Sequence, residues 1–417
     1  MASPRLDRQL RIPEWRQEVL SRARLGVVGD DTQLTSLFLL GAAALGINEV
    51  RVIAPCLAER LLGLARALNP DWRLQHLRGY LTHPLCLEAL RQCHPLVDLS
   101  HFSLAGKILL EHAFQHRLTV VRGRRWQEAQ TQGLAVLTYQ RGREWRDLQE
   151  VLSAQQLPSG IPPNLDGVLD IITAGIMLEE VKTILMTGQS SAEVLAYAGP
   201  RWTAAAQQPA IGIVGAGALG NFVGLGLAMA GFRHLTFIDP DVIEVTNLNR
   251  QIFFGGAVGA GKAQTLAARL HQDFGIPAQY LADSFQAEHV NRFDLMFDCV
   301  DNFASRIAIS EACAALGTPL VSGGADVARG QVVTFHPLLQ PQTPAALLNM
   351  SAGQQTREAE DRRQSRAACI YQPNPAVIMT NQVIGGFMVE AARHLLAGMP
   401  WPPLWYDASA PHKLGRA

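Results

Sequence analysis

The sequence has no excess of either charge and no closely paired cysteines. Its 417 residues include 36 Lys plus Arg and 36 Asp plus Glu, so the formal net charge is zero. Balanced charge argues against bulk attraction to nucleic acid or to an anionic membrane, and neither is an expected partner. None of the six cysteines forms a C-x-x-C pair, so no zinc site of the usual thiolate spacing is expected.

The sequence also lacks long apolar runs. No stretch of about 18 or more uninterrupted apolar residues occurs, so no membrane-spanning helix is expected. The first 15 residues are charged and have no apolar segment of the kind found in signal peptides. These absences favour a cytoplasmic protein. Hydrophobic residues make up 48% of the chain and charged residues 17%, a composition that suits a large globular core.

What the chain does contain is one pattern written twice. Residues 25–30 (LGVVGD) and 211–216 (IGIVGA) each read as a buried strand running into a turn. An apolar helix follows each of them, and then a second short strand, at 49–55 and at 235–240. Strand, helix and strand in this order indicate a parallel sheet in a doubly wound α/β fold. The sequence therefore predicts two tandem Rossmann-like domains.

The ends of the two halves match as well. Residues 163–188 and 373–398 both have the character of a long helix with small residues on one side. Four residues of the second segment, Pro373, Asn374, Gly385 and Glu390, each lie 210 positions after an identical residue of the first. Duplication of a whole domain explains this better than two unrelated helices of similar composition.

The boundaries follow from this repeat. We expect a first domain over 1–188, a linker over 189–209 that is partly helical, and a second domain over 210–417. Within the second domain, a crossover loop is predicted at about 340–372, because the stretch 350–368 is polar and poor in apolar residues. An exposed helix is the alternative for that stretch.

A glycine-rich turn in the second half carries the first chemical signal. Gly215, Gly217 and Gly220 form G-x-G-x-x-G directly after a predicted strand and at the start of a predicted helix. Such glycines let backbone N–H groups approach phosphate oxygens closely. Asp239 ends the next strand, 19 positions after Gly220, where a carboxylate can bind ribose hydroxyls. These residues alone suit a nicotinamide dehydrogenase as well as an ATP-dependent enzyme.

Polar and charged residues farther along the chain favour the ATP-dependent enzyme over the dehydrogenase. Asn247, Arg250 and Gln251 lie in NLNRQ, and Lys262 follows in VGAGKAQ. Two fixed positive charges near a ribose suit a triphosphate whose pyrophosphate must leave. In FDCVDN at 297–302, Asp301 stands at the end of a parallel strand, where a carboxylate can hold Mg²⁺ on phosphates. The alternative is that Asp301 and Asn302 cap the next helix.

Together, GAGALG, FIDPDVIEVTNLNRQ, Lys262 and FDCVDN resemble the adenylation domain of the ubiquitin-activating enzyme superfamily, which includes the bacterial molybdopterin-synthase and thiamine-pathway adenylyltransferases. The resemblance implies ATP and Mg²⁺ as cofactors. It implies that Asp239 binds ribose, that Asp301 holds the metal, and that Arg306 is a further site arginine. Phosphate-binding roles fall to Asn247, Arg250, Gln251 and Lys262. The implied reaction is adenylation of a protein's C-terminal carboxylate.

The first half resembles a silent copy of this domain. GDDTQL at 29–34 replaces the glycine turn, and Asp30 and Asp31 repel phosphates. RLDRQLRIPEW at 5–15 resembles the family's N-terminal R-x-x-R-Q element, whose second arginine reaches across the dimer to the partner's ATP. Here that residue is Arg8, so the resemblance implies an internal pseudo-dimer in which Arg8 completes the second half's site. A surface helix charge is the alternative for Arg8.

Cys369 lies in AACIYQPNP, near the point where small activating enzymes place a thioester cysteine. Arg363, Arg366 and a helix N-terminus nearby can lower the pKa of such a thiol. The alternative is a buried cysteine that fills space in a loop. Catalytic candidates are therefore Cys369, Arg8, Arg250 and Lys262.

The leading hypothesis is an activating enzyme for a ubiquitin-like β-grasp protein, with a thioester at Cys369 and a conjugating enzyme as a second partner. The fused halves resemble eukaryotic ubiquitin-activating enzymes and the activating enzymes of bacterial ubiquitin-like conjugation operons, some of which act in antiphage defence. Alternatives are a sulfur-carrier adenylyltransferase without a catalytic cysteine, a non-catalytic binder of a β-grasp protein, and a nicotinamide dehydrogenase.

Overall fold

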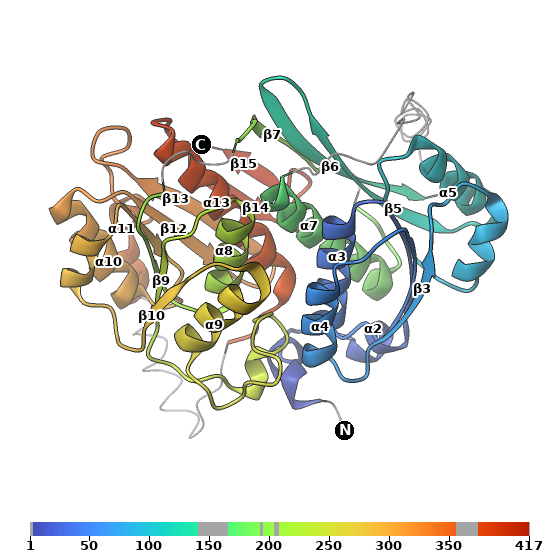
Figure 1. Ribbon diagram of the computed structural model, residues 1–417, viewed down its shortest axis with the longest axis horizontal. Helices are drawn as coiled ribbons and strands as arrows, with labels where there is room; N and C mark the ends of the chain where they lie inside the picture. Colours follow the sequence, from blue (N-terminus) through green and yellow to red (C-terminus); the bar gives the residue numbers. More distant parts are fainter. Residues whose placement is uncertain (1–2, 141–165, 192–194, 204–207, 356–373, 417) are drawn as a thin grey trace.

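The computed structural model describes residues 3–140, 166–191, 195–203, 208–355 and 374–416. Two mixed sheets stand side by side, one built from each half of the chain (Figure 1). Helices cover the sheets, and the longest ones lie where the halves meet. Among the described residues, no helix is long and apolar enough to cross a membrane.

The first sheet has seven strands, and its strand order reverses between β1 and β4. The pairs from the β3 edge to β5 are parallel, and the pairs of β6 with β5 and with β7 are antiparallel. In spatial order the strands are β3 (Arg73–Arg78), β2 (Glu49–Ala54), β1 (Arg24–Gly29), β4 (Leu96–Leu99), β5 (Thr119–Gln127), β6 (Thr131–Gln140) and β7 (Leu195–Pro200).

The second sheet repeats this order and adds one strand at its far edge. Its first five strands are parallel and its last three are antiparallel. In spatial order they are β10 (Gln279–Leu281), β9 (Leu235–Ile238), β8 (Ile211–Val214), β11 (Leu295–Asp298), β12 (Leu320–Ala325), β13 (Arg329–Phe335), β14 (Leu404–Asp407) and β15 (Leu414–Arg416). The predicted pair of doubly wound α/β domains is confirmed.

The helices after β1 and β8 are both apolar and largely buried, but they begin and end differently. α3 is almost wholly buried, begins at Asp31, whose carboxylate accepts from the N–H groups of Gln33 and Leu34, and ends at Gly46 with φ of 90°. α8 is equally apolar and begins after Gly217. The main helices are α3 (Thr32–Leu45), α4 (Glu59–Leu68), α5 (Ser103–His116), α7 (Gly167–Thr187), α8 (Ala218–Met229), α9 (Lys262–Phe274), α10 (Phe303–Leu316) and α13 (Ile378–Leu396).

Short helical segments connect these elements. Those near the chain start carry the residues that reach the other half, and one follows β9 in the second half. They are η1 (Pro4–Leu6), α1 (Asp7–Leu10), α2 (Gln17–Arg22), η2 (Pro84–Leu90), η3 (Val245–Asn247), η4 (Ala287–Arg292) and α11 (Pro344–Leu347).

The two halves pack through the matched helices α7 and α13. A Cβ added at Gly175 of α7 would lie 2.9 Å from Val383 Cγ2, and one added at Gly386 of α13 would lie 2.4 Å from Ile172 Cγ1. Glycine therefore allows the two helices to approach closely. Buried polar groups join the halves too: Arg393 Nη1 lies 2.6 Å from Asp166 Oδ2. The duplicated helices thus form the contact between the two copies.

The structure corrects the expected linker. Its middle is not helical but forms β7, which pairs with β6 and belongs to the first sheet. Leu195 and Tyr197 on this strand are buried, and the Tyr197 hydroxyl donates to Glu390 Oε2 of α13 at 3.2 Å. The alternation of apolar and small residues in LAYAGP suits a strand, but its Ala and Gly content concealed it.

Candidate active site

The glycine turn lies between β8 and α8, where the order of the second sheet reverses. Gly215 has φ of 94°, and a Cβ there would lie 2.8 Å from the carbonyl oxygen of Cys299. A Cβ at Gly220 would lie 2.0 Å from the carbonyl oxygen of Gly215. By contrast, the nearest atom to a Cβ at Gly217 is Gln251 Nε2, 3.8 Å away. Two glycines therefore shape the turn, and Gly217 leaves its face open.

Asp239 follows β9 and fixes the turn from the side. Its Oδ2 accepts from the N–H of Ala216 at 2.7 Å, and its Oδ1 accepts from the N–H of Asp241 at 2.8 Å. Burial raises the pKa of Asp239, although these backbone bonds and Lys262 act in the opposite direction. The carboxylate predicted to bind ribose is thus held rigidly beside the glycine turn.

The residues of NLNRQ form a tight turn at η3. Asn247 Oδ1 accepts from the N–H of Glu244 at 3.0 Å, so its side chain stabilises the turn itself. Arg250 is buried, and its Nη1 donates to the carbonyl of Thr246 and to Asn249 Oδ1. Gln251 is buried, and its Oε1 has no hydrogen-bond partner among the described residues. An unpaired buried oxygen is costly and marks this turn as a place that suits a ligand.

Arg8 brings the first half to the same place. It lies on α1, its Nη1 donates to the carbonyl of Asn374 at 2.9 Å, and within the described part of the chain its buried Nε has no partner. Burial lowers the pKa of Arg250 to about 10; repulsion from Arg8 adds to this, and Asp301 and Glu244 oppose it. These charges act on one another across the two halves, and Arg250 remains protonated at neutral pH.

One residue of this cluster was missed at the sequence level. Asn249 is fully buried, and its Nδ2 donates to Gln9 Oε1 at 3.2 Å and to the carbonyl of Ala376 at 2.9 Å, while its Oδ1 accepts from Arg250. Asn249 therefore ties the N-terminal segment to the η3 turn and orients Arg250. The only signal was its position within NLNRQ, which does not separate it from its neighbours.

Lys262 and Asp301 lie at the rim. Lys262 begins α9, and its Nζ lies 2.7 Å from Asp241 Oδ2, which is largely exposed. Asp301 is exposed, whereas Asn302 caps α10 by accepting from the N–H of Ser305 at 2.8 Å. The capping alternative therefore applies to Asn302, and Asp301 is left for another role. The described residues hold no group of three or more metal-ligating side chains.

Arg306 has a structural position. Its Nε lies 3.1 Å from Asp298 Oδ2, and its Nη2 donates to Ser322 Oγ and to the carbonyl of Gly323. Ser322 Oγ also donates to Asp298 Oδ2. This buried arrangement joins α10 to β11 and β12, and it supports a scaffold role rather than the expected contact with nucleotide. Cys369 and most of the predicted crossover loop lie outside the described residues.

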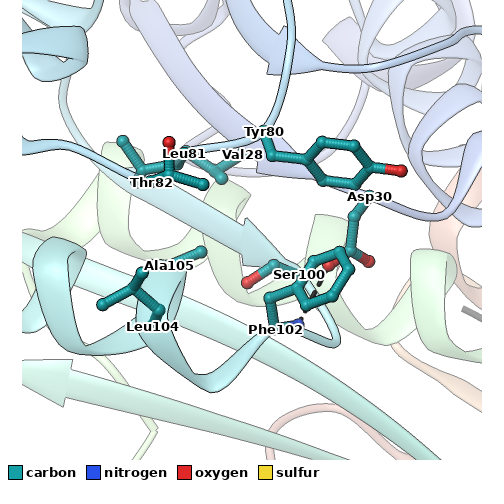
Figure 2. A pocket seen from close by; sticks show the side chains of 10 residues that line it. Val28, Asp30, Tyr80, Leu81, Thr82, Ser100, Phe102, Leu104 and Ala105 are labelled. Carbon is teal, nitrogen blue, oxygen red and sulfur yellow. Dashed lines mark hydrogen bonds between the residues drawn. The ribbon is translucent and has the colours of Figure 1, made fainter. Parts of the chain in front are cut away.

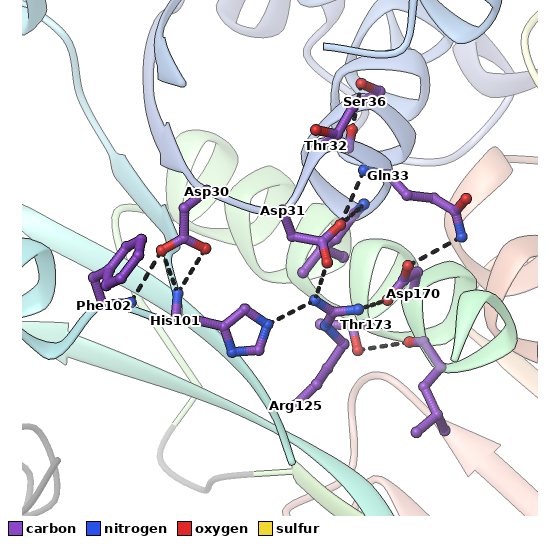
Figure 3. A network of polar contacts seen from close by, with 12 residues as sticks. Asp30, Asp31, Thr32, Gln33, Ser36, His101, Phe102, Arg125, Asp170 and Thr173 are labelled. Atoms are coloured by element: carbon purple, nitrogen blue, oxygen red, sulfur yellow. Dashed lines mark hydrogen bonds and ion pairs between the residues drawn. The ribbon is translucent and has the colours of Figure 1, made fainter. Parts of the chain in front are cut away.

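At the equivalent turn, the first half holds an ion-pair network. Arg125 Nη2 lies 2.8 Å from Asp31 Oδ2 and 3.0 Å from His101 Nε2, and its Nη1 pairs with Asp170 (Figure 3). Burial acts to raise the pKa of Asp31, but Arg125 holds it below its usual value. Asp30 accepts from the N–H groups of His101 and Phe102. Acidic side chains and their own cation thus stand where the second half has its open glycine turn, and the silence of the first half remains a prediction.

The fold and this site define a duplicated doubly wound protein in which one half keeps a glycine turn without a side-chain cap. The sequence profile of the ThiF family matches residues 190–408, slightly more than half of the chain. The chain belongs to the ThiF family.

Curated relatives match a smaller part of the chain than the family profile does. The pig adenylyltransferase and sulfurtransferase MOCS3 is 39% identical over 131 residues, which are 30% of this chain and 29% of that protein. The Escherichia coli sulfur carrier protein ThiS adenylyltransferase is 37% identical over 131 residues, 30% of this chain and 52% of the relative. A crystal structure of E. coli MccB with AMPCPP and MccA aligns with a TM-score of 0.41 and 16% identity, over 50% of this chain and 63% of that one. The matched regions therefore span only part of each relative.

Proposed function

We propose that the second half adenylates the C-terminal carboxylate of a small protein with ATP, and that the first half supplies Arg8. The observation that supports this most strongly is the convergence of unpaired or charged polar groups on one open turn. Gly217 leaves its face free, Gln251 Oε1 and Arg8 Nε are buried without partners among the described residues, and Arg250 stands among them. The two arginines and the open glycine turn suit the triphosphate of a nucleotide, whereas Gln251 Oε1, an acceptor, suits one of its hydroxyl or amino donors.

The residues present fit a nucleotide with its metal ion. Asp239 stands rigidly beside the turn, where it can accept from ribose hydroxyls. Mg²⁺ is usually bound by one or two carboxylates together with substrate phosphates, and exposed Asp301 offers one carboxylate. When bound, the ion would neutralise phosphate charge. Lys262, paired only with the largely exposed Asp241, is a second cation that phosphates can recruit.

The proposed reaction forms one bond and breaks another. An oxygen of the protein substrate's carboxylate attacks the α-phosphorus, and the bond from that phosphorus to the bridging oxygen of the leaving pyrophosphate breaks. The products are an acyl adenylate and pyrophosphate, with no change in oxidation state. Negative charge grows on the leaving group, so Arg250 and Arg8 are placed to stabilise it more strongly than they stabilise bound ATP.

The substrate class is taken from the relatives together with the sequence. The relative MOCS3 is named as an adenylyltransferase and sulfurtransferase. The E. coli relative is named as the adenylyltransferase of the sulfur carrier protein ThiS. We infer a protein substrate of the same kind, a ubiquitin-like or sulfur-carrier protein of the β-grasp fold. Transfer to a Cys369 thioester, and then to a conjugating enzyme, is the fuller form of this proposal, and it rests on the sequence around Cys369.

ATP–pyrophosphate exchange with a candidate β-grasp protein tests the adenylation step. Asp301→Ala should abolish Mg²⁺-dependent exchange, whereas Glu311→Ala, an exposed acid on α10, should leave it unchanged. Exchange at the wild-type level in Asp301→Ala would exclude this role for the carboxylate.

The variant Cys369→Ala distinguishes an activating enzyme that forms a thioester from a sulfur-carrier adenylyltransferase that does not. If Cys369 carries a thioester, this variant should keep exchange but lose the thiol-sensitive linkage between enzyme and modifier. A linkage that survives in Cys369→Ala would remove Cys369 from the mechanism, and no linkage in the wild type would favour the sulfur-carrier adenylyltransferase.

A further inference from the structure

The first half contains a pocket that the adenylation proposal does not use. Its volume is about 130 Å³. It is lined by the end of β1, the loop after β3, the loop after β4 and the first turn of α5, through Val28, Gly29, Asp30, Tyr80, Leu81, Thr82, Ser100, Phe102, Leu104 and Ala105. Figure 2 shows Tyr80 and Phe102 at one end beside Asp30, with Leu104 and Ala105 at the other.

The position of this pocket is one where doubly wound sheets bind ligands. β1 pairs with β2 on one side and with β4 on the other, so the strand order reverses between β1 and β4. Ligands of open α/β sheets bind beyond the carboxyl ends of the strands at such a point. The first half has therefore lost the phosphate turn but kept a cavity at the binding edge of its sheet.

Two polar side chains of the pocket, Asp30 and Ser100, are already engaged in hydrogen bonds. Both carboxylate oxygens of Asp30 accept backbone N–H groups, from His101 and Phe102 at 2.8 to 3.0 Å. The Ser100 hydroxyl donates to Asp98 Oδ1. The remaining walls are mostly aliphatic or aromatic carbon, so burial of apolar surface is the main attraction that the pocket offers to a ligand.

Charge excludes a phosphate from this place. Asp30, Asp31 and Asp98 are buried carboxylates near the pocket, and the buried arginines beside them are already ion-paired, Arg122 with Asp98 and Arg125 with Asp31 and Asp170. Burial raises the pKa of Asp30 to about 6, so this side chain is still mostly ionised at pH 7. An anionic ligand would meet repulsion, and an uncharged one would not.

The aromatic end of the pocket favours a ring. The rings of Tyr80 and Phe102 meet edge to face, with centroids 5.1 Å apart and an interplanar angle of 85°. Tyr80 is 38% exposed, so this pair stands at the mouth. Aromatic side chains in this arrangement offer an edge and a face to a third ring.

We propose that the first half binds an uncharged aromatic ring in this pocket, independently of the nucleotide site of the second half. The ring can belong to a free small molecule or to an aromatic side chain of a peptide. Indole and N-acetyl-tryptophanamide carry the same ring without charge, and they distinguish the two sources because only the second has a peptide backbone on both sides.

Isothermal titration calorimetry of the full chain with each probe is the test. We expect saturable binding of indole; additional binding of N-acetyl-tryptophanamide would assign the ring to a peptide, and its absence would assign it to a free molecule. Tyr80→Ala should weaken binding about three- to tenfold, the equivalent of one aromatic contact. Tyr280→Ala, a tyrosine of similar exposure on β10, should leave binding unchanged.

A filling substitution gives a second arm. Ala105 is 3% exposed and lines the inner end, so Ala105→Leu should abolish binding while ATP–pyrophosphate exchange continues. Exchange also reports that the variant is folded. The proposal would be overturned if the wild type showed no saturable binding of indole. It would also be overturned if Tyr80→Ala and Ala105→Leu bound indole as tightly as the wild type, or if indole competed with ATP.

Discussion

The two halves share a strand order, a central strand and a following helix, yet they differ at the residue that begins this helix. Gly217 stands there in the second half and Asp31 in the first. The glycine leaves the first N–H groups of α8 open to a ligand, whereas the Asp31 carboxylate occupies those of α3. The comparison teaches that a side chain which satisfies the helix end occupies the N–H groups that the proposed phosphate site would use, without disturbing the fold.

The carboxylates have also changed place between the halves. In the second half, Asp239 follows β9 and bonds the N–H of Ala216 in the turn. In the first half, the corresponding positions hold Ala54 and Asp30, so the carboxylate stands in the turn itself and accepts from N–H groups of the loop after β4 instead. The negative charge has moved from the side of the site into its centre, where a phosphate would otherwise lie.

The largest effect is expected from Arg125→Met. This change leaves Asp31 and Asp170 buried without their cation, and breaking a buried pair in this way lowers the free energy of unfolding by about 3–5 kcal/mol. Urea denaturation measures it, with Arg73→Met, an exposed arginine on β3, as the control. A loss no greater than that of the control would show that the network does not hold the silent half together.

Arg250→Ala should affect the proposed catalysis more than the stability of the fold. Removal of a cation that faces developing charge is expected to lower ATP–pyrophosphate exchange about 10²–10³-fold. Arg233→Ala, at the other end of β9, is the matched control in the same half. Exchange within a few-fold of the wild type would separate Arg250 from catalysis and weaken the contrast between the halves.

Asp30→Asn tests the cost of the displaced carboxylate. The pKa of Asp30 is raised to about 6 by burial, so the folded protein binds this proton more tightly than the unfolded chain does. Its contribution to stability is present below about pH 4 and is lost as the pH rises through 6. The variant should therefore gain on the order of 2–3 kcal/mol relative to the wild type between pH 4 and pH 7.

Urea denaturation at a series of pH values follows this difference. Asp283→Asn, an exposed aspartate of the second half, serves as its reference. A constant difference between wild type and Asp30→Asn across that range would contradict the assignment.

The smallest effect is expected from Arg8→Ala. One charged hydrogen-bonding side chain is lost from the shared site, so exchange should fall about tenfold. Arg11→Ala, one turn later and paired with exposed Asp7, should have no effect on exchange. Equal rates in both variants would mean that the first half contributes structure but no charge to the reaction.

Much of this architecture could be predicted because it rests on local patterns. The strand, turn and helix repeats, and the matched segments 163–188 and 373–398, follow from periodicity and internal similarity. β7 was not predicted, since its Ala and Gly residues lack a strand signature and it is stabilised by pairing with β6.

The candidate site was likewise predictable only in part. The glycine turn was visible because its residue types are dictated by backbone geometry at Gly215 and Gly220. The bridging role of Asn249 and the pairing of Arg306 with Asp298 depend on contacts between distant segments. Nothing in the local sequence distinguishes such an asparagine or arginine from one that faces a ligand.

The short N-terminal helix has a consequence for how the chain becomes active. Arg8 and Gln9 lie before both sheets in the chain, but they contact Asn374 and Asn249 in the other half. The proposed reaction site is therefore incomplete until residue 374 has been synthesised and has docked. Cleavage anywhere between the halves, followed by their separation, would break the proposed site even though each sheet kept its own core.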